Sequence, residues 1–389
     1  MVESFTFQAP RNILFQPGAS RRMGEVVAHY GARRVMLVTG KIVRSAGLTA
    51  GAEASLAAAG IGVSIFDDVV ADTPSQVVEA AVAACRADRI DLVLSIGGGS
   101  ALDTAKLVAY LAKTPDRLDD IYGVGVAQGR RLPLLLAPTT AGTGSEVTPI
   151  AIVTTPGTQK KGVVSPVLIP DWAILDAELT VSLPAFVTAA TGIDAMVHAI
   201  EAYTSKHRKN PISDQFARQA LGLLSANIRR VCEDGQNLEA RSQMLLGSML
   251  AGMAFANAPV AAVHALAYPI GAIFHVPHGL SNALILTQVL RFNLPAAELL
   301  YAELAPVVDF QAVKLSVAQR ARLFVDAMSA ICRDCRIPPS LADVGIGAQD
   351  LNELAKHAMK QTRLLVNNPR EVHFDDALAI YTEAFENQA

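Results

Sequence analysis

Short apolar runs alternate with helical patterns along the first part of the chain. Most of these runs are rich in valine, leucine and isoleucine and stop at a glycine or a proline. Such runs are typical of parallel strands buried on both faces, and their alternation with helices predicts a covered α/β sheet. The expected strands are 34–39, 62–66, 91–96 and 131–137, and the expected helices between them are 48–59 and 75–87.

From about residue 184 onward, the strand pattern fades and helical patterns follow one another. A chain of 389 residues also exceeds the usual size of one hydrophobic core, so two domains are expected. We therefore predict an α/β domain at residues 1–180 and an all-helical domain at residues 181–389. The expected helices of the second domain are 185–204, 213–231, 238–257, 317–335, 351–360 and 374–385.

Composition and charge narrow the classes of function. The chain is 51% hydrophobic and 18% charged, which describes a globular protein with an ample core. Its net charge of −3, without a basic cluster, indicates that nucleic acid is not a partner. The first residues lack a signal-peptide pattern and only four cysteines occur, so a cytoplasmic location is expected. Cys332 and Cys335 form a single CxxC, which we interpret as two thiols without a joint role.

One long segment, residues 242–290, contains no aspartate, glutamate, lysine or arginine. A membrane span needs about 20 apolar residues, so this segment is long enough to be tested for one. Prolines, asparagines and histidines interrupt it, and we therefore predict buried core helices and no membrane contact. Polar groups in such a core are costly unless they are used, which draws attention to His264 and His278.

A glycine triplet lies between the third expected strand and the helix that follows it. Gly97, Gly98 and Gly99 let a backbone approach a diphosphate, and a helix N-terminus favours its negative charge. We expect Ser100 to cap this helix, with Asp103 closing a capping-box-like pair. A tight turn without a ligand would give the same pattern. The position of the triplet at the carboxyl end of a parallel strand favours phosphate binding.

A second loop, residues 138–148, follows the next expected strand and gathers glycines and hydroxyl side chains. Hydroxyls can bond phosphate or ribose oxygens, although turns rich in serine and threonine are common without a ligand. Two such loops on neighbouring strand ends predict a nucleotide site, and the absence of GxGxxG indicates a geometry other than the Rossmann one. The candidate residues of this loop are Thr139, Thr140, Thr143 and Ser145.

Four residues could hold a metal ion. Asp194 and His198 are four positions apart in an expected helix, so both side chains leave the same face. Such a pair alone is more often an ion pair or a hydrogen bond. With His264 and His278 it would form a mixed nitrogen and oxygen site, which suits Fe²⁺, Zn²⁺, Ni²⁺ or Mn²⁺ better than Ca²⁺. Spacing alone does not show that the four side chains converge.

Four segments together resemble the iron-containing, or group III, alcohol dehydrogenases, in that family's order and spacing over nearly the whole chain. The resemblance implies a dehydroquinate-synthase-like fold, with an α/β dinucleotide-binding domain followed by an all-helical metal-binding domain. It also implies a homodimeric oxidoreductase that transfers a hydride between NAD(P) and a small alcohol or aldehyde, whose oxygen a divalent metal polarises. The segments are GGGSALDTAK (97–106), PTTAGTGSEVT (138–148), GIDAMVHAIEAY (192–203) and HALAYPIGAIFHVPHGLSNA (264–283).

Carried over by position, the resemblance assigns roles to individual residues. Fe²⁺ is the implied metal, with Zn²⁺ as the other candidate. Lys161 aligns with a lysine that contacts the cofactor ribose, and Lys160 is the alternative. The implied metal ligands are Asp194, His198, His264 and His278. The implied cofactor contacts are Gly97, Gly98, Gly99 and Ser100 at the pyrophosphate, with Asp103 nearby, and Thr139, Thr140, Thr143 and Ser145 toward the ribose and nicotinamide.

The chain departs from the family pattern at several positions. Gly40 ends the first expected strand, where many NAD-specific members carry an aspartate that bonds the ribose and repels a 2′-phosphate. We therefore expect this cofactor-binding position to admit NADP as well as NAD. Tyr268 replaces a histidine found in many members, so a different proton route is expected. Residues 258–261 replace a stretch that is richer in glycine, so substrate specificity does not carry over.

Other functions remain as alternatives. A metal-independent maleylacetate reductase belongs to the same superfamily, but the intact set of one aspartate and three histidines argues against it. A zinc-dependent glycerol-type dehydrogenase and a dehydroquinate-synthase-like lyase would share the fold. A regulator that binds nucleotide or metal without turnover has no support from a DNA-reading motif or a basic stripe.

Overall fold

The protein is described from a computed structural model, in which residues 4–156 and 159–386 are placed. The chain forms two compact units. One unit is Gln8–Ser182. The other unit is Leu183–Ala389 together with the N-terminal residues up to Phe7. The ring of Phe7 packs against that of Phe216 with centroids 5.7 Å apart, which ties the start of the chain to the helical unit.

The first unit is built on a six-stranded parallel sheet with strand order β1-β9-β6-β4-β2-β3. The predicted α/β fold is confirmed, and β4 is buried along its whole length, as its continuous apolar run indicates. The strands are β1 (Asn12–Phe15), β2 (Arg34–Val38), β3 (Gly62–Phe66), β4 (Leu92–Gly97), β6 (Leu134–Pro138) and β9 (Trp172–Leu175).

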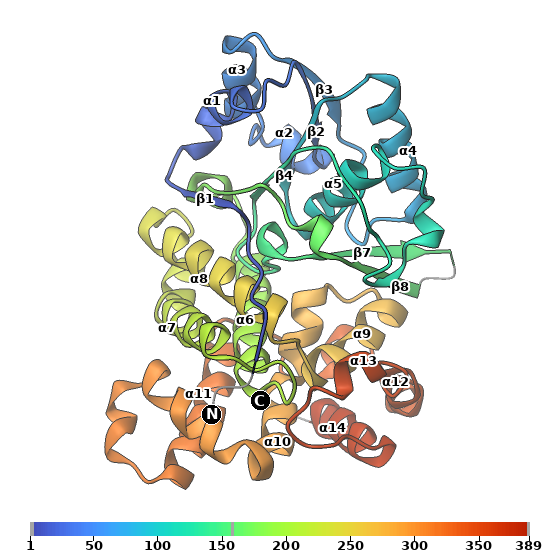
Figure 1. The fold of residues 1–389 in the computed structure, drawn as a ribbon. Helices are drawn as coiled ribbons and strands as arrows, with labels where there is room; N and C mark the ends of the chain where they lie inside the picture. Colours follow the sequence, from blue (N-terminus) through green and yellow to red (C-terminus); the bar gives the residue numbers. More distant parts are fainter. Residues whose placement is uncertain (1–3, 157–158, 387–389) are drawn as a thin grey trace. The chain divides into compact units, whose positions relative to one another are not determined.

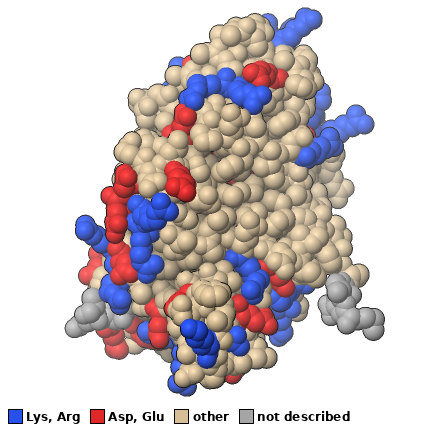
Figure 2. All heavy atoms as spheres, turned by 90° about the vertical axis from the view of Figure 1, so that its left-hand side faces the viewer, with Lys and Arg blue, Asp and Glu red and all other residues tan. Residues whose placement is uncertain are grey.

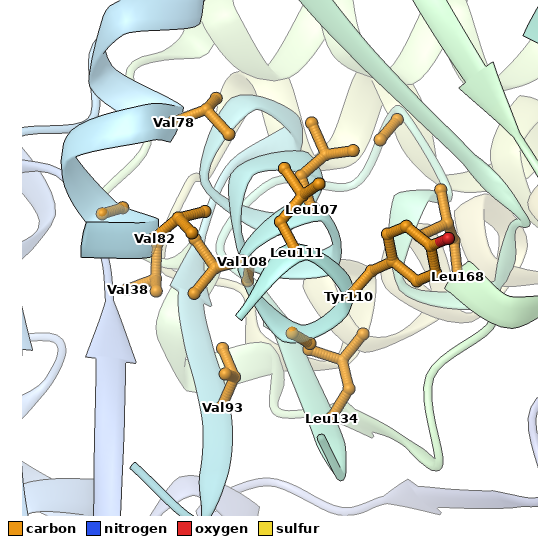
Figure 3. Packing of buried hydrophobic residues seen from close by; sticks show 14 of the residues in the cluster. Val38, Val78, Val82, Val93, Leu107, Val108, Tyr110, Leu111, Leu134 and Leu168 are labelled. Carbon is orange, nitrogen blue, oxygen red and sulfur yellow. The ribbon is translucent and has the colours of Figure 1, made fainter. Parts of the chain in front are cut away.

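Helices cover both faces of this sheet. Side chains of β2 accordingly alternate between two hydrophobic cores. Met36 and Val38 join one core, and Val35 and Leu37 join the other. Figure 3 shows the first core, where α4 and α5 pack over β2, β4 and β6. The α-helices are α1 (Met23–Ala28), α2 (Lys41–Ser45), α3 (Ala50–Ala58), α4 (Ser75–Ala87) and α5 (Gly99–Leu111), and 3-10 helices occupy Ala19–Arg22, Leu118–Asp120, Ser145–Val147, Pro166–Leu168 and Ala177–Thr180.

A three-stranded sheet of order β5-β8-β7 completes the first unit. Buried and half-buried residues alternate along β7, as expected for a sheet with one covered face. β7 pairs with β8 in the antiparallel sense, and β5 pairs with β8 in the parallel sense. The strands are β5 (Gly123–Val124), β7 (Ile150–Thr155) and β8 (Gln159–Val164).

The second unit is helical in its described residues, as predicted (Figure 1). α6 and α8 coincide with the predicted helices 185–204 and 238–257. The α-helices are α6 (Ala185–Thr204), α7 (Pro211–Glu233), α8 (Leu238–Asn257), α9 (Ala262–Phe274), α10 (His278–Val308), α11 (Val317–Asp334), α12 (Leu351–Ala358), α13 (Thr362–Leu365) and α14 (Phe374–Glu386), and 3-10 helices occupy Phe310–Lys314, Leu341–Val344 and Ala348–Asp350.

The charge-free segment 242–290 forms α9, most of α8 and the first part of α10. By length and composition α10 could cross a membrane, but 56% of its most apolar window is buried inside the protein. This burial agrees with the predicted core helices. Charged side chains of both signs lie interspersed on the face shown in Figure 2, and no extended patch of one sign is visible there.

Candidate functional site

The glycine triplet lies where β4 ends at Gly97 and α5 begins at Gly99. A Cβ atom at Gly97 would lie 2.5 Å from the Cβ of Ala101, and one at Gly99 would lie 2.8 Å from Cγ2 of Thr143. Neither distance leaves room for a side chain. Glycine is therefore required at both positions by close packing, and Gly99 lies directly against the second loop.

The start of α5 differs from the prediction. Gly98, not Ser100, is the N-cap residue, and it makes no side-chain hydrogen bond to the helix. Ser100 lies within the first turn, where its Oγ accepts a hydrogen bond from the backbone N–H of Asp72 at 3.2 Å. The predicted capping pair of Ser100 and Asp103 is therefore wrong. Gly98 has the extended backbone of an N-cap residue and carries no side chain, so the N-terminus of the helix has no side-chain cap.

The second loop begins where β6 ends at Pro138, directly beside the glycine triplet. Pro138 is the register partner of Gly97, and the backbone N–H of Thr139 donates to the carbonyl of Gly97 at 2.9 Å. Thr139 and Ser145 are buried, whereas Thr140 and Thr143 are half-buried. The two loops thus lie on neighbouring strand ends, as the sequence predicts.

A buried lysine that the sequence reasoning did not single out joins the two loops. Lys106 is fully buried on α5, and its Nζ donates to Ser145 Oγ at 2.8 Å, Thr148 Oγ1 at 3.1 Å and the carbonyl of Ile150 at 2.6 Å. Asp103 accepts from Ser145 Oγ at 2.5 Å. Burial lowers the pKa of Lys106, while the nearby Asp103 acts against this. Asp103 and Ser145 therefore bind each other and Lys106, which fixes the second loop on α5.

The other cofactor candidates of the first unit come from two further elements, the end of β2 and strand β8. Gly40 follows β2 and is the N-cap residue of α2. Lys161 lies on β8, and its Nζ is 5.2 Å from the centroid of the Tyr122 ring. Lys160, the alternative to Lys161, forms an ion pair of 2.6 Å with Asp72, whose backbone contacts the glycine loop.

Three of the four predicted metal ligands converge in the helical unit. Asp194 and His198 lie one turn apart on α6, and His264 lies in the first turn of α9. One ligand atom from each lies within 4.8 Å of the others, and all three side chains are buried. The rings of His198 and His264 are stacked with centroids 4.7 Å apart. The i and i+4 spacing on α6 therefore does place both side chains toward one point.

His278, the fourth predicted ligand, is the first residue of α10 and lies beside this cluster. Its Nε2 is 3.7 Å from Oδ1 of Asp194, and its ring centroid is 5.4 Å from that of His264. Its side chain is 32% exposed, against 2% for Asp194, so it forms the accessible side of the group.

Two polar residues that the sequence reasoning missed hold these ligands. Oε2 of Glu201 on α6 lies 2.7 Å from Nδ1 of His264, within hydrogen-bond distance. Asn282 on α10 donates through Nδ2 to Oδ1 of Asp194 at 2.6 Å. A signal for both was present, because Glu201 follows His198 by three positions and Asn282 follows His278 by four.

Burial and neighbouring charge set the protonation states of the cluster. Burial opposes ionisation of Asp194, but the histidines and the Asn282 amide together hold its pKa below the ordinary value. Burial, and then the proximity of His198, lowers the pKa of His264 well below the ordinary value. Burial raises the pKa of Glu201 to about 7, although the hydrogen bonds from the backbone N–H groups of Ala261 and Val263 lower it. Asp194 is thus a carboxylate and His264 a neutral imidazole at neutral pH, and these are the ligand forms of both residues.

The donor atoms fit a divalent transition metal. Nε2 of His264 is buried and has no hydrogen-bond partner among the residues that the structure describes. This nitrogen lies 3.8 Å from Oδ1 of Asp194, beyond hydrogen-bond range. An imidazole nitrogen without a partner and a buried carboxylate oxygen together suit Fe²⁺, Zn²⁺ or Mn²⁺, and they do not suit a metal ion that prefers thiolate ligands.

Residues 10–177 match the family model described as iron-containing alcohol dehydrogenase, and residues 188–385 match that of the Fe-containing alcohol dehydrogenase family, C-terminal. The chain belongs to the iron-containing alcohol dehydrogenase family. It is 39% identical to long-chain-alcohol dehydrogenase 1 of Geobacillus thermodenitrificans, over 95% of this chain and 93% of that protein. It is 33% identical to the NAD-dependent methanol dehydrogenase of Bacillus methanolicus, over 94% of this chain and 96% of that protein.

A solved structure of 1,3-propanediol oxidoreductase is similar over 98% of this chain and all of that chain, with a TM-score of 0.95 and 35% identity. These comparisons confirm the predicted family, the fold and the enzyme class. The chain is therefore an oxidoreductase of a metal- and NAD-dependent alcohol dehydrogenase family, whose members act on alcohols or aldehydes.

Proposed function

We propose that the enzyme transfers a hydride between NAD or NADP and a small alcohol or aldehyde, at a single Fe²⁺ held by Asp194, His198, His264 and His278. The observation that carries the proposal is the buried cluster of Asp194, His198 and His264, with donor atoms within 4.8 Å of one another. A bound metal ion would supply a Lewis acid toward the substrate oxygen. The partial exposure of His278 supports substrate access from its side of the cluster.

Aromatic side chains around the cluster support a site that excludes water. Phe255 stacks on His198 with ring centroids 4.2 Å apart and an interplanar angle of 17°, and it is buried. The ring of Tyr268 lies 5.8 Å from that of His278. We propose that Phe255 forms an apolar wall and that Tyr268 lines the substrate side. Exclusion of water strengthens the electrostatic interactions of the reacting groups.

For the cofactor, we propose that the glycine triplet and Ser100 bind the pyrophosphate at the N-terminus of α5. The absence of a side-chain cap on this helix supports the assignment, because its N-terminus favours a negative group. Of the second loop, the half-buried Thr140 and Thr143 are the better-placed contacts, together with Thr139. Ser145 and Asp103 act by fixing the loop. Lys161 is proposed to contact the ribose, and Gly40 leaves room for a 2′-phosphate.

Metal removal and restoration test the function. Protein treated with a chelator should lose alcohol-dependent reduction of NAD(P) and should regain it with Fe²⁺, or with Zn²⁺ if that is the native ion. The variant D194N should remain inactive after Fe²⁺ is added. The matched control is D326N, because Asp326 is an exposed carboxylate on α11 of the same unit. Activity that is indifferent to chelation would favour a metal-independent reductase of the maleylacetate type and would refute the proposal.

We also propose a homodimer that works in the cytoplasm, as the family pattern and the sparse cysteines suggest. The described cysteines are all free thiols, which is consistent with a reducing compartment. Light scattering on the purified enzyme would give the mass of the assembly, and a monomer mass of 41.1 kDa would contradict the dimer.

A further inference from the structure

Glu201 is a buried carboxylate whose three hydrogen bonds all come from one short segment at the start of α9. Its Oε2 accepts from the backbone N–H of Ala261 at 2.9 Å and is hydrogen-bonded to Nδ1 of His264 at 2.7 Å. Its Oε1 accepts from the backbone N–H of Val263 at 2.6 Å. The side chain is about 5% exposed, so water does not compete for these bonds. Glu201 itself lies on α6, the helix that carries Asp194 and His198.

The hydrogen bond to Glu201 dictates which nitrogen of His264 faces the metal centre. Both oxygens of Glu201 already accept backbone N–H groups, so the carboxyl group faces His264 as an acceptor and we assign the hydrogen of the ring to Nδ1. In a neutral ring the other nitrogen, Nε2, then holds a free lone pair. That atom is the one with no hydrogen-bond partner among the described residues, and it lies 3.8 Å from Oδ1 of Asp194. The carboxylate therefore aims the lone pair of His264 at the other ligands.

The same carboxylate also supports the helix that carries His264. α8 and α9 meet at a bend of 106°, and the N-cap residue of α9 is Ala261, which has no side-chain cap of its own. A helix N-terminus needs acceptors for its first N–H groups. Glu201 supplies them from α6 through Ala261 and Val263. The position of α9 and the orientation of its ligand are thus set by one side chain.

We propose that Glu201 is a positioning residue that fixes the tautomer and orientation of His264, and so sets the affinity of the centre for a divalent cation. The proposal rests on the metal centre proposed above. It assigns Glu201 no contact with substrate or metal. Carboxylate partners of ligand histidines raise ligand basicity and hold the ring in place, and their loss commonly weakens metal binding about 10- to 100-fold.

The variant E201Q keeps the shape of the side chain but has only one acceptor oxygen. In one orientation its NH₂ group faces the N–H of Val263, and in the other it faces Ala261 and Nδ1 of His264. The second orientation forces the hydrogen of His264 onto Nε2, and a metal ion cannot bind a nitrogen that carries a hydrogen. Either arrangement leaves donors facing each other. We expect Zn²⁺ to bind E201Q about 10- to 100-fold more weakly than the wild type, measured by competition with a chromophoric chelator.

The control and a second variant separate positioning from folding. E303Q removes an exposed carboxylate of α10 that accepts from Tyr203, and it should bind Zn²⁺ like the wild type. E201D keeps the negative charge on a shorter side chain and should bind Zn²⁺ with an affinity between those of wild type and E201Q. If E201Q does not fold, E201D decides: wild-type affinity in E201D would overturn the proposal.

A measurement on the metal-free enzyme reads the tautomer directly. The eight histidines would be labelled with ¹⁵N, and the His264 signals would be assigned by their absence in H264Q. The wild type and E201D should show the tautomer with hydrogen on Nδ1, and E201Q should show a larger share of the tautomer with hydrogen on Nε2. If E201Q keeps that tautomer and binds Zn²⁺ within about twofold of wild type, the proposal is wrong. If D194N binds Zn²⁺ as the wild type does, the proposed metal centre itself fails, which is a distinct result.

Discussion

Replacing Gly279 with alanine would test how closely the metal centre depends on the contact between α10 and α6. A Cβ atom at Gly279 would lie 2.5 Å from the backbone oxygen of Ala190 and 3.3 Å from Cβ of Asp194. An ordinary contact begins at 3.4 Å, and a backbone oxygen cannot turn aside. The start of α10 must therefore retreat from α6 by about 0.9 Å, the shortfall to that ordinary contact.

This retreat should affect both stability and metal binding. Overpacking of this kind costs about 1–3 kcal/mol, which urea unfolding of the metal-free enzyme would measure. His278 is the residue before Gly279, and metal–ligand distances tolerate only about 0.2 Å. The shift therefore takes His278 out of ligand range, and Zn²⁺ affinity should fall at least about tenfold, or roughly 1.4 kcal/mol.

A matched glycine on α7 provides the control. A Cβ atom at Gly222 would lie 3.4 Å from Cγ1 of Val307, which is an ordinary contact within the same unit. Since alanine favours a helix interior over glycine, G222A should gain up to about 1 kcal/mol and leave Zn²⁺ affinity unchanged. If G279A were as stable as the wild type to within roughly 0.5 kcal/mol and bound Zn²⁺ as tightly, the packing argument would be refuted.

Two further predictions concern the α/β unit. G40D should lower kcat/KM for NADP relative to NAD at least about tenfold, because a carboxylate there repels the 2′-phosphate. The control is G40A, which places the same Cβ 2.9 Å from the backbone oxygen of Val69 but adds no charge, and it should leave this ratio unchanged. Burial raises the pKa of Glu146 from 4.5 to about 7, so between these pH values the folded enzyme keeps a proton that the unfolded chain releases, and stability falls as pH rises. In urea unfolding, the stability of E146Q relative to wild type should therefore increase from pH 5 to pH 8, by up to about 3 kcal/mol. A difference between the two proteins that becomes smaller as the pH rises would contradict this.

Much of the α/β sheet could be predicted because its central strands are buried on both faces and read as continuous apolar runs. β1 and β9 were not predicted, since each is only four residues long and gives a weak local signal. The start of β8 was also obscured, because Lys160 and Lys161 precede its apolar residues. Its strand conformation comes from antiparallel pairing with β7, a tertiary interaction that a local pattern does not contain.

The candidate site divides in the same way between local and tertiary information. The pair of Asp194 and His198 follows from helical spacing alone. The approach of His264 depends on the bend of 106° between α8 and α9, which spacing does not encode. Glu201 was overlooked because it reads as one more polar residue of a helix, and its role emerges only once α9 packs against it. Ser100 was assigned as a cap because glycine N-caps carry no side-chain signal.

The contact between Gly99 and Thr143 has a consequence for how the two nucleotide loops change in evolution. With only 2.8 Å from a Cβ at position 99 to Cγ2 of Thr143, position 99 cannot accept a side chain while Thr143 stays as it is. Lys106 adds a second constraint by binding Ser145 from the helix that follows the glycines. The two loops should therefore be inherited as a pair. Exchanging one of them alone between homologues should give chimaeras that misfold or do not bind the cofactor.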